Sequence, residues 1–204
     1  MMKLSTGLLR RLPLYLRYLQ SLSDDVINIS ATTIAAALKL GEVQVRKDLG
    51  TVSGAGRPKT GYNRILLIET LEEYLGYNKV KKAVIFGAGK LGEALMSYSG
   101  FDDYGLKIVA AFDITNIGTS SSGKPIYPIE SFTDFCKQED ISIGIIAVPH
   151  SAAQSVCDII CENGIKAIWN FAPAQLNVPT DVIIHEENMA ASLALLSKQI
   201  ESLT

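Results

Sequence analysis

The sequence is poor in the residues that most often carry chemistry at protein sites. It holds two histidines and three cysteines among 204 residues, and no two cysteines form a C-x-x-C pair. We therefore expect no bound metal and no disulfide framework. The odd cysteine count without a secretory leader favours a reducing compartment. Cys157 and Cys161 lie one helical turn apart, which suits a metal or a thiol switch but is more typical of an apolar core.

Long apolar runs are also missing. No stretch approaches the roughly 18–20 apolar residues that a helix needs to cross a bilayer. The leucine-rich N-terminal stretch is interrupted by Arg10, Arg11 and Arg17, so it lacks the apolar centre of a secretory signal. We expect a cytoplasmic protein. The 48% hydrophobic content is sufficient for a globular core.

Charge is distributed unevenly along the chain. Residues 1–64 carry ten Lys and Arg against four Asp and Glu, a balance of +6, whereas the whole chain carries −2. The remaining residues therefore carry −8. A basic head on an acidic body predicts that the head alone contacts a polyanion.

The basic head contains apolar residues at helical spacing. The first series is Leu8, Leu12, Leu16, Leu19 and Leu22. Pro13 lies inside it, so the helix begins near Pro13 or bends there. In the next segment, "NISATTIAAALKLG", Ser30 is placed to cap a helix, Ile34 and Leu38 share a face, and Gly41 is placed to close the turn.

A second short helix is predicted over "EVQVRKDL", residues 42–49. Val45 and Leu49 point inward, and the other surface is covered by Gln44, Arg46, Lys47 and Asp48. The glycine-rich "GTVSGAGRPKTGYNRI" that follows predicts a hairpin with a basic tip. Two short helices, a turn and a basic hairpin together predict a winged helix-turn-helix.

In such a head the second helix enters the major groove of DNA. Gln44 can pair with adenine and Arg46 with guanine, while Lys47 suits a phosphate. Arg57 and Lys59, at the hairpin tip, suit the minor groove or the backbone. The alternative is that "QVRKDL" is only a solvated helix face, and the +6 head and the hairpin argue against it.

From residue 82 onward strand-like and helical stretches alternate. The apolar runs are "AVIF", "IVAAFD", "IGIIAV", "AIWNF" and "DVIIH". Helices are expected at residues 90–98, 130–139, 152–163 and 188–203. This alternation predicts a Rossmann-like α/β domain with a parallel sheet covered on both faces. We place the domain boundary within residues 76–82.

The stretch "AVIFGAGKLGEAL" combines a strand, a glycine turn and a helix start. Gly87 allows the tight turn, Gly89 lets the backbone approach a pyrophosphate, and Gly92 lets the helix pack on the strand. Amide groups at the helix start hold the anion. Asp113 ends the next strand, where an acid bonds a ribose 2′-hydroxyl and repels a 2′-phosphate, so NAD(H) is favoured over NADP(H). The alternative is a turn whose glycines serve packing only.

Candidates for catalysis are few. The segment "AVPH", residues 147–150, ends a later strand. It is expected either to line the cofactor crevice beside the glycine turn or to be simply a proline turn. His150, at its end, is placed to contact a cofactor. His185 is expected at the surface or at an interface. Neither histidine has a neighbouring acid that would mark a general base. The remaining length leaves no room for a substrate domain, so we expect no catalytic residues.

Taken together, these stretches resemble the Rex family of redox-sensing transcriptional repressors. The matching segments are "RRLPLYLRYL", "QVRKDL", the "GY" at residues 61–62, "GAGKLGEAL", "YSGF", "IVAAFD", "AVPHSAAQ", "GIKAIWNFAP" and a terminal helix after "VIIHEEN". The resemblance implies a homodimer whose C-terminal helix swaps into the partner. It also implies that the free or NAD+-bound form holds a palindromic operator and that NADH releases it. Tyr98 is similar to the family's tyrosine near the nicotinamide, or is an ordinary partly buried helix tyrosine.

The expected domains are a winged-helix DNA-binding domain at 1–78, a Rossmann NAD(H)-binding domain at 79–185 and a dimerisation helix at 186–204. The expected cofactor-binding residues are Gly87, Ala88, Gly89, Lys90, Leu91, Gly92, Tyr98, Asp113, Val148, Pro149, His150, Asn170 and Met189. The expected DNA-binding residues are Arg11, Gln44, Arg46, Lys47, Arg57, Lys59 and Tyr62.

The chain departs from the family pattern in three places. The wing lacks the usual aromatics after "QVRKDL", which predicts a wing without aromatic packing beneath it. Asn188 stands where the family has an Asp that pairs with the first helix's Arg, here Arg17, so the relay of redox state is expected to be weaker or rebuilt. Lys90 replaces an Asn, and its charge can strengthen pyrophosphate binding regardless of the oxidation state of the nicotinamide.

The preferred interpretation is a non-catalytic, dimeric repressor that binds operator DNA and responds to the NADH/NAD+ ratio. Three alternatives stay open. The chain is a small NAD-dependent oxidoreductase, or a nucleotide- or coenzyme A-binding module whose basic head contacts protein. The third alternative is a DNA-binding regulator that has lost its response to NADH through Asn188 and Lys90.

Overall fold

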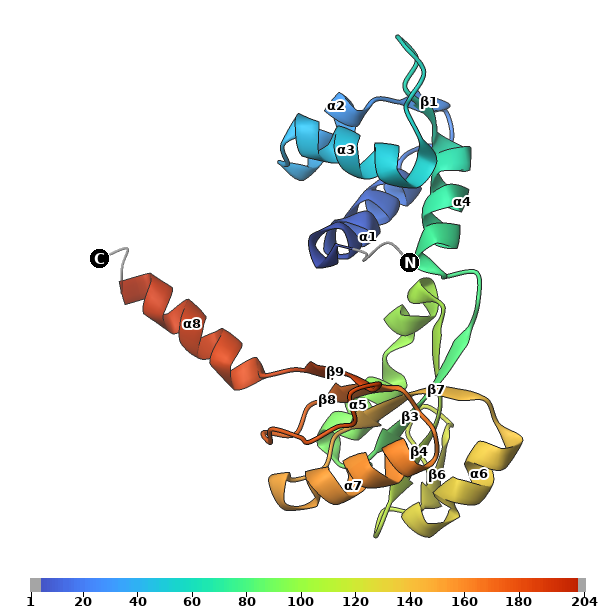
Figure 1. Cartoon of the computed structure of the whole chain (residues 1–204), viewed down its shortest axis with the longest axis vertical. Helices are drawn as coiled ribbons and strands as arrows, with labels where there is room; N and C mark the ends of the chain where they lie inside the picture. Colours follow the sequence, from blue (N-terminus) through green and yellow to red (C-terminus); the bar gives the residue numbers. More distant parts are fainter. Residues whose placement is uncertain (1–4, 202–204) are drawn as a thin grey trace. The chain divides into compact units, whose positions relative to one another are not determined.

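The computed structural model describes residues 5–201 of the chain (Figure 1). The described fold divides into two units, and the boundary along the chain lies between Lys79 and Val80. Each unit has its own apolar core. The functional domains proposed at 1–78, 79–185 and 186–204 stay a prediction.

The first unit, the head, is built from four helices and a two-stranded antiparallel sheet. Its helices are α1 (Thr6–Ser21), α2 (Ala31–Leu38), α3 (Glu42–Ser53) and α4 (Arg64–Leu75). The strands are β1 (Asn28–Ile29) and β2 (Tyr62–Asn63). Leucines of α1 and α4 pack with Ile34 and Val45 in one buried cluster, which confirms the predicted helix-turn-helix core.

The start of α2 is as predicted, but its end differs. The Ser30 hydroxyl accepts a hydrogen bond from the Thr33 amide at 3.0 Å, so Ser30 is the N-cap. Lys39, with φ 53°, takes the left-handed position that closes the helix, and Gly41 instead precedes α3 as its N-cap. The prediction for Gly41 was therefore wrong, because the α2 turn closes two residues earlier than expected.

Three other boundaries in the head shift. Helix α1 begins seven residues before Pro13 and continues through it, so Pro13 does not mark the helix start. Helix α3 extends to Ser53 and takes in the first four residues of the segment predicted as the hairpin. The remaining hairpin, the wing, is closed by two backbone hydrogen bonds between Arg57 and Gly61, of 2.8 and 2.9 Å. Lys59 lies between them, so the basic tip is confirmed.

The second unit contains a seven-stranded sheet in the order β5-β6-β4-β3-β7-β8-β9. Its strands are β3 (Lys81–Phe86), β4 (Leu106–Asp113), β5 (Gly118–Thr119), β6 (Pro125–Pro128), β7 (Ile141–Ile146), β8 (Ala167–Asn170) and β9 (Ile183–Glu186). All neighbours pair in parallel except β5 with β6. The six parallel strands follow the Rossmann order, which confirms the predicted fold class. Strand β6 was missed because prolines stand at both its ends.

Helices cover both faces of the sheet. They are α5 (Lys90–Ser97), α6 (Phe132–Gln138) and α7 (His150–Glu162), with short 3-10 turns η1 (Ser99–Tyr104) and η2 (Ile129–Ser131). The terminal helix α8 (Met189–Glu201) follows β9 and does not pack on the sheet. Side chains from α6 and α7 pack on the strand face that holds Phe86 and Phe112. Met96 of α5 packs on the opposite face.

Helix α8 is exposed from Met189 to Ile200. The sequence predicted a helix at 188–203, of which residues 202–203 lie outside the described part of the chain. Among residues 5–201, no helix is both long and apolar enough to cross a membrane.

Candidate functional site

The glycine turn after β3 forms a cradle at the carboxyl edge of the sheet. Gly87 has φ 97°, and a Cβ there would lie 2.6 Å from the Ala147 carbonyl oxygen. A Cβ on Gly92 would lie 1.9 Å from the Gly87 carbonyl oxygen, so only glycine fits where α5 packs on the turn. A Cβ on Gly89 would meet no atom within 4 Å. Open room at the α5 N-terminus suits an anion held by first-turn amides.

Asp113, at the end of β4, is bonded to this turn. Its Oδ2 accepts a hydrogen bond from the Ala88 amide at 2.7 Å, and Oδ1 accepts from the amides of Thr115 and Asn116 at 2.8 and 3.0 Å. Burial favours the protonated carboxyl, but these backbone donors outweigh it and hold the pKa of Asp113 below its usual value. Asp113 therefore anchors the glycine turn as well as standing at the predicted ribose position.

The ends of β7 and β8 reach the same edge. Strand β7 pairs with β3, so Val148 and Pro149, which follow β7, lie beside the glycine turn, and a Cβ on Gly87 would come within 3.0 Å of Val148. His150 begins α7, and its Nδ1 donates to the Pro173 carbonyl at 2.8 Å. Asn170 is 1% exposed and bonds to Ala172 and Ala174 at 2.9 Å each. Asn170 thus shapes the loop after β8, and direct cofactor contact stays a prediction.

The remaining cofactor candidates are more exposed. The Tyr98 ring is 59% exposed and contacts Phe101 edge-on, with ring centres 5.0 Å apart. Lys90 is the exposed first residue of α5, with the half-buried Leu91 next to it. Met189, at the start of α8, is 58% exposed. Tyr98 is therefore not the partly buried tyrosine that the sequence left open.

The residue before Met189 has a local role. The Asn188 Oδ1 accepts a hydrogen bond from the Ala191 amide at 2.8 Å, and the Ser192 amide bonds to the Asn188 carbonyl at 3.0 Å. Asn188 is therefore placed to cap α8, as an Asp there would be. Compared with the Asp of the family pattern, Asn188 retains the capping oxygen and lacks only the negative charge.

A basic groove lies between α3 and the wing of the head. It is a hollow of about 530 Å³ whose lining includes Arg46 from α3 and Arg57 and Lys59 from the wing. Arg46 also pairs with Glu42 one helical turn earlier. Lys47 is exposed on α3. The structure thus brings three of the predicted DNA-binding cations around one groove.

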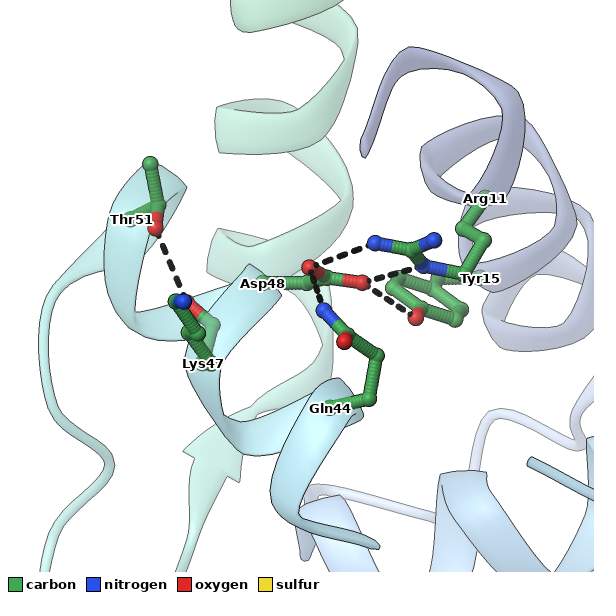
Figure 2. Close-up of polar contacts among 6 residues, drawn as sticks. All are labelled: Arg11, Tyr15, Gln44, Lys47, Asp48 and Thr51. Atoms are coloured by element: carbon green, nitrogen blue, oxygen red, sulfur yellow. Dashed lines mark hydrogen bonds and ion pairs between the residues drawn. The ribbon is translucent and has the colours of Figure 1, made fainter. Parts of the chain in front are cut away.

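Figure 2 shows that the next residue of α3, Asp48, points toward Arg11 and Tyr15 of α1. Its carboxylate accepts hydrogen bonds from Arg11 Nε at 2.6 Å, Arg11 Nη2 at 3.0 Å, the Tyr15 hydroxyl at 2.7 Å and Gln44 Nε2 at 2.7 Å. Burial raises the pKa of Asp48, but these donors outweigh burial and lower it overall. Burial also raises the pKa of Tyr15, as does its bond to Asp48.

The prediction that Asp48 lies on the helix surface was wrong. Asp48 is 3% exposed and shares the inward face with Val45, Leu49 and Val52. Counted from Val45, the positions 48, 49 and 52 follow at three, four and seven residues, which is helical spacing. That spacing is visible in the sequence. Asp48 was nevertheless assigned to the surface, because an unpaired carboxylate is costly to bury. Arg11 supplies the missing charge, so its predicted contact with DNA is not favoured by this geometry.

Arg64 is one of the ten basic residues counted in the +6 balance of residues 1–64, and it too is internal. It is 5% exposed, and its Nη1 donates to the carbonyls of Leu19 and Leu22 at 3.3 and 3.1 Å. Its Nη2 donates to the Asp24 carboxylate at 2.7 Å. Arg64 therefore ties the end of α1 to the start of α4. Because Arg11 pairs with Asp48 and Arg64 with Asp24, two cations and two acids cancel, and residues 1–64 keep their balance of +6 on eight cations rather than ten.

The wing has aromatic support, contrary to prediction. A Cβ on Gly56 would come within 2.8 Å of the Tyr62 ring, so the ring lies directly against the wing backbone. The Tyr62 hydroxyl donates to the Gly54 carbonyl at 3.4 Å. The aromatic ring comes from the strand after the wing rather than from the segment before it.

The other candidates do not form a reactive site. Cys157 is buried in the sheet core, and burial raises the pKa of its thiol to about 12. Within residues 5–201 no group of His, Cys, Asp and Glu is arranged to hold a metal. His185 does have an acidic neighbour, contrary to prediction: its Nε2 lies 3.1 Å from Glu187 Oε1, on the exposed edge strand β9.

A winged-helix head with a basic groove and a parallel sheet with a glycine cradle define the class of winged-helix regulators that carry a nucleotide-binding domain. Residues 3–50 match the family described as "Putative DNA-binding protein N-terminus", and residues 78–174 match the CoA binding domain family. The redox-sensing transcriptional repressor Rex of Bacteroides thetaiotaomicron is 39% identical, over 94% of this chain and 89% of the relative. The chain therefore belongs to the Rex family of redox-sensing transcriptional repressors.

Solved structures agree with this assignment. RSP, a Rex-family repressor, in complex with beta-NAD+ and operator DNA has a TM-score of 0.92 at 35% identity, covering 99% of this chain and 94% of RSP. RSP in complex with beta-NADH has a TM-score of 0.84 at 34% identity, covering 99% and 96%.

Proposed function

We propose that this chain is a redox-sensing transcriptional repressor that binds double-stranded operator DNA as a homodimer and is released by NADH. The observation that carries the proposal is the pairing, on one chain, of the Arg46–Arg57–Lys59 groove with the cradle at Gly87, Gly89 and Gly92. Operator DNA bound to the Rex-family repressor RSP supports the first part, and NAD+ and NADH bound to RSP support the second.

The residues of the glycine cradle in the second unit fit NAD(H). The room at Gly89 and the first-turn amides of α5 suit the pyrophosphate, and Lys90 adds a positive charge beside it. Asp113 is placed to accept a ribose hydroxyl and repels a 2′-phosphate, because its lowered pKa keeps it ionised. NAD(H) is an effector here, and the protein residues bind and orient it without chemistry.

Homodimer formation is supported by helix α8. Its exposed apolar residues Met189, Leu193, Leu196 and Ile200 recur every three or four positions and form one stripe. The uncharged dihydronicotinamide is cheaper to bury near Tyr98 and the partner subunit's Met189 than the cationic oxidised ring. This difference is the proposed source of redox discrimination, because a ligand shifts an equilibrium only by its differential affinity.

The protein is proposed to act without catalysis and in the cytoplasm, where operator DNA is accessible. The exposed His185–Glu187 pair lies on the edge strand and not at the glycine cradle. The chain's relatives are transcriptional repressors.

The test is a cofactor titration of the protein–DNA complex. Duplexes are selected from a random-sequence pool, and the complex is then titrated with NADH and NAD+ while fluorescence anisotropy reports release. We expect release by NADH at concentrations at least tenfold below those of NAD+, and a dimer by light scattering. Equal potency of the two forms would rule out redox sensing.

A further inference from the structure

The Gln44 side chain is exposed on α3, yet its amide is held from behind. Its Nε2 donates to Asp48 Oδ1 at 2.7 Å, one helical turn along the same helix (Figure 2). Asp48 itself is 3% exposed. A surface residue suited to reading a base is thus tied to a buried charge.

The tie fixes which end of the amide faces outward. A carboxylate only accepts hydrogen bonds, so the amide nitrogen must face Asp48 and Oε1 must face away from it. The carboxylate receives three further donors, two from Arg11 and one from Tyr15, so it is itself held in place. Turning the amide over would set Oε1 against an ionised carboxylate at hydrogen-bond distance.

We propose that Asp48 is a positioning residue of DNA recognition, which makes Gln44 selective for adenine over guanine. The inference rests on the proposed operator binding. The outward Oε1 and the remaining amide hydrogen match the donor N6 and acceptor N7 of adenine. Guanine offers two acceptors at this edge, O6 and N7, and repels the outward oxygen. A free glutamine can turn its amide to suit guanine, whereas Gln44 on Asp48 cannot.

The test compares matched duplexes in a double-mutant cycle. Selected duplexes are varied base pair by base pair, and the position read by Gln44 is the one where Gln44→Ala removes the preference between A and G. Wild type should prefer A there by about 10- to 100-fold. Asp48→Asn should reduce that ratio at least severalfold, because the new amide lets Gln44 turn over. In the Gln44→Ala background Asp48→Asn should leave the ratio unchanged.

Tyr15→Phe is the matched control. It removes one hydrogen bond from the same carboxylate and leaves the Gln44 bond in place. We expect it to lower the melting temperature and to keep the A-to-G ratio of wild type. The proposal is overturned if Asp48→Asn weakens A and G equally, if the two substitutions act additively on the ratio, or if no position responds to Gln44→Ala.

A measurement on unliganded wild type covers the case in which Asp48→Asn does not fold. The side-chain ¹⁵N order parameter of Gln44 should approach about 0.85, whereas that of the exposed Gln138 should fall below about 0.6. Equal mobility of the two side chains would overturn the proposal. If no duplex is bound at all, the proposed function fails, and the order parameter still reports whether Asp48 holds Gln44.

Discussion

The two units hold their functional polar groups by different means. In the head, side chains hold side chains: Arg11, Tyr15 and Gln44 meet on the Asp48 carboxylate. In the nucleotide-binding unit, backbone groups hold the polar site. The Asp113 carboxylate accepts hydrogen bonds from the backbone amides of Ala88, Thr115 and Asn116, and the glycines let backbone segments approach each other closely. The head should therefore be sensitive to the loss of a charge, and the second unit to the gain of a methyl group.

The largest expected effect on cofactor binding is that of Gly92→Ala. The added Cβ would lie 1.9 Å from the Gly87 carbonyl oxygen, so the cradle must open. We expect the Kd for NADH to rise by ~100-fold, measured by NADH fluorescence titration.

A glycine of the head provides the control. A Cβ on Gly50 in α3 meets nothing within 4 Å, so Gly50→Ala should stabilise the chain by about 0.5–1 kcal/mol. Unchanged NADH binding in Gly92→Ala would contradict the backbone account of the cradle.

Asp48→Ala should destabilise the head by about 3–5 kcal/mol, because it leaves the Arg11 charge without its buried partner. Urea unfolding followed by far-UV circular dichroism measures this. Asp24→Ala is the matched control, since Asp24 is fully exposed and Arg64 keeps its two carbonyl partners. Similar midpoints for the two variants would argue against the buried network.

Asp113→Ala should raise the Kd for NADH by about 10- to 100-fold. The variant removes the carboxylate that bonds the Ala88 amide of the glycine turn, and it removes the proposed acceptor for a ribose hydroxyl. NADPH binding should be weakened less, since the variant also removes a charge that repels the 2′-phosphate. Calorimetric titration with both cofactors measures the two effects, and the exposed Asp103→Ala serves as the control. Equal losses for NADH and NADPH would remove Asp113 from the ribose site.

Acid should weaken both units through these two carboxyls. The pKa of Asp48 and that of Asp113 are lowered in the folded chain, so the unfolded chain binds protons first as pH falls. Their stabilisation is fully present above the unfolded value of about 3.9 and is lost as pH falls through the folded values. Melting temperatures between pH 7 and pH 2.5 should show this loss, with a shallower acid limb in Asp113→Asn. An unchanged limb would show that Asp113 is not stabilised in its ionised form.

The smallest effect is expected on the wing. Lys59→Gln should weaken operator binding severalfold and reduce the slope of log affinity against log salt by about one. Lys107→Gln, on β4 of the second unit, should leave the slope unchanged. If both variants behave alike, the wing lysine does not contact phosphate.

The sequence by itself determined the local elements and their order. Apolar spacing predicted the first three helices of the head, Ser30 predicted the start of α2, and continuous apolar runs predicted five of the seven strands of the sheet. The glycine spacing at 87, 89 and 92 predicted the cradle. These features depend on residues close together along the chain, so periodicity and local backbone chemistry were sufficient to find them.

Only the tertiary structure decided which polar side chains are internal. Asp48 meets Arg11 from 37 positions away, Arg64 meets Leu19 from 45 positions away, and the partner of the wing backbone is Tyr62 on the following strand. A buried charge is tolerable only when an opposite charge and hydrogen-bond donors reach it. The sequence does not state which distant segment supplies them, because packing of the apolar faces brings those segments together.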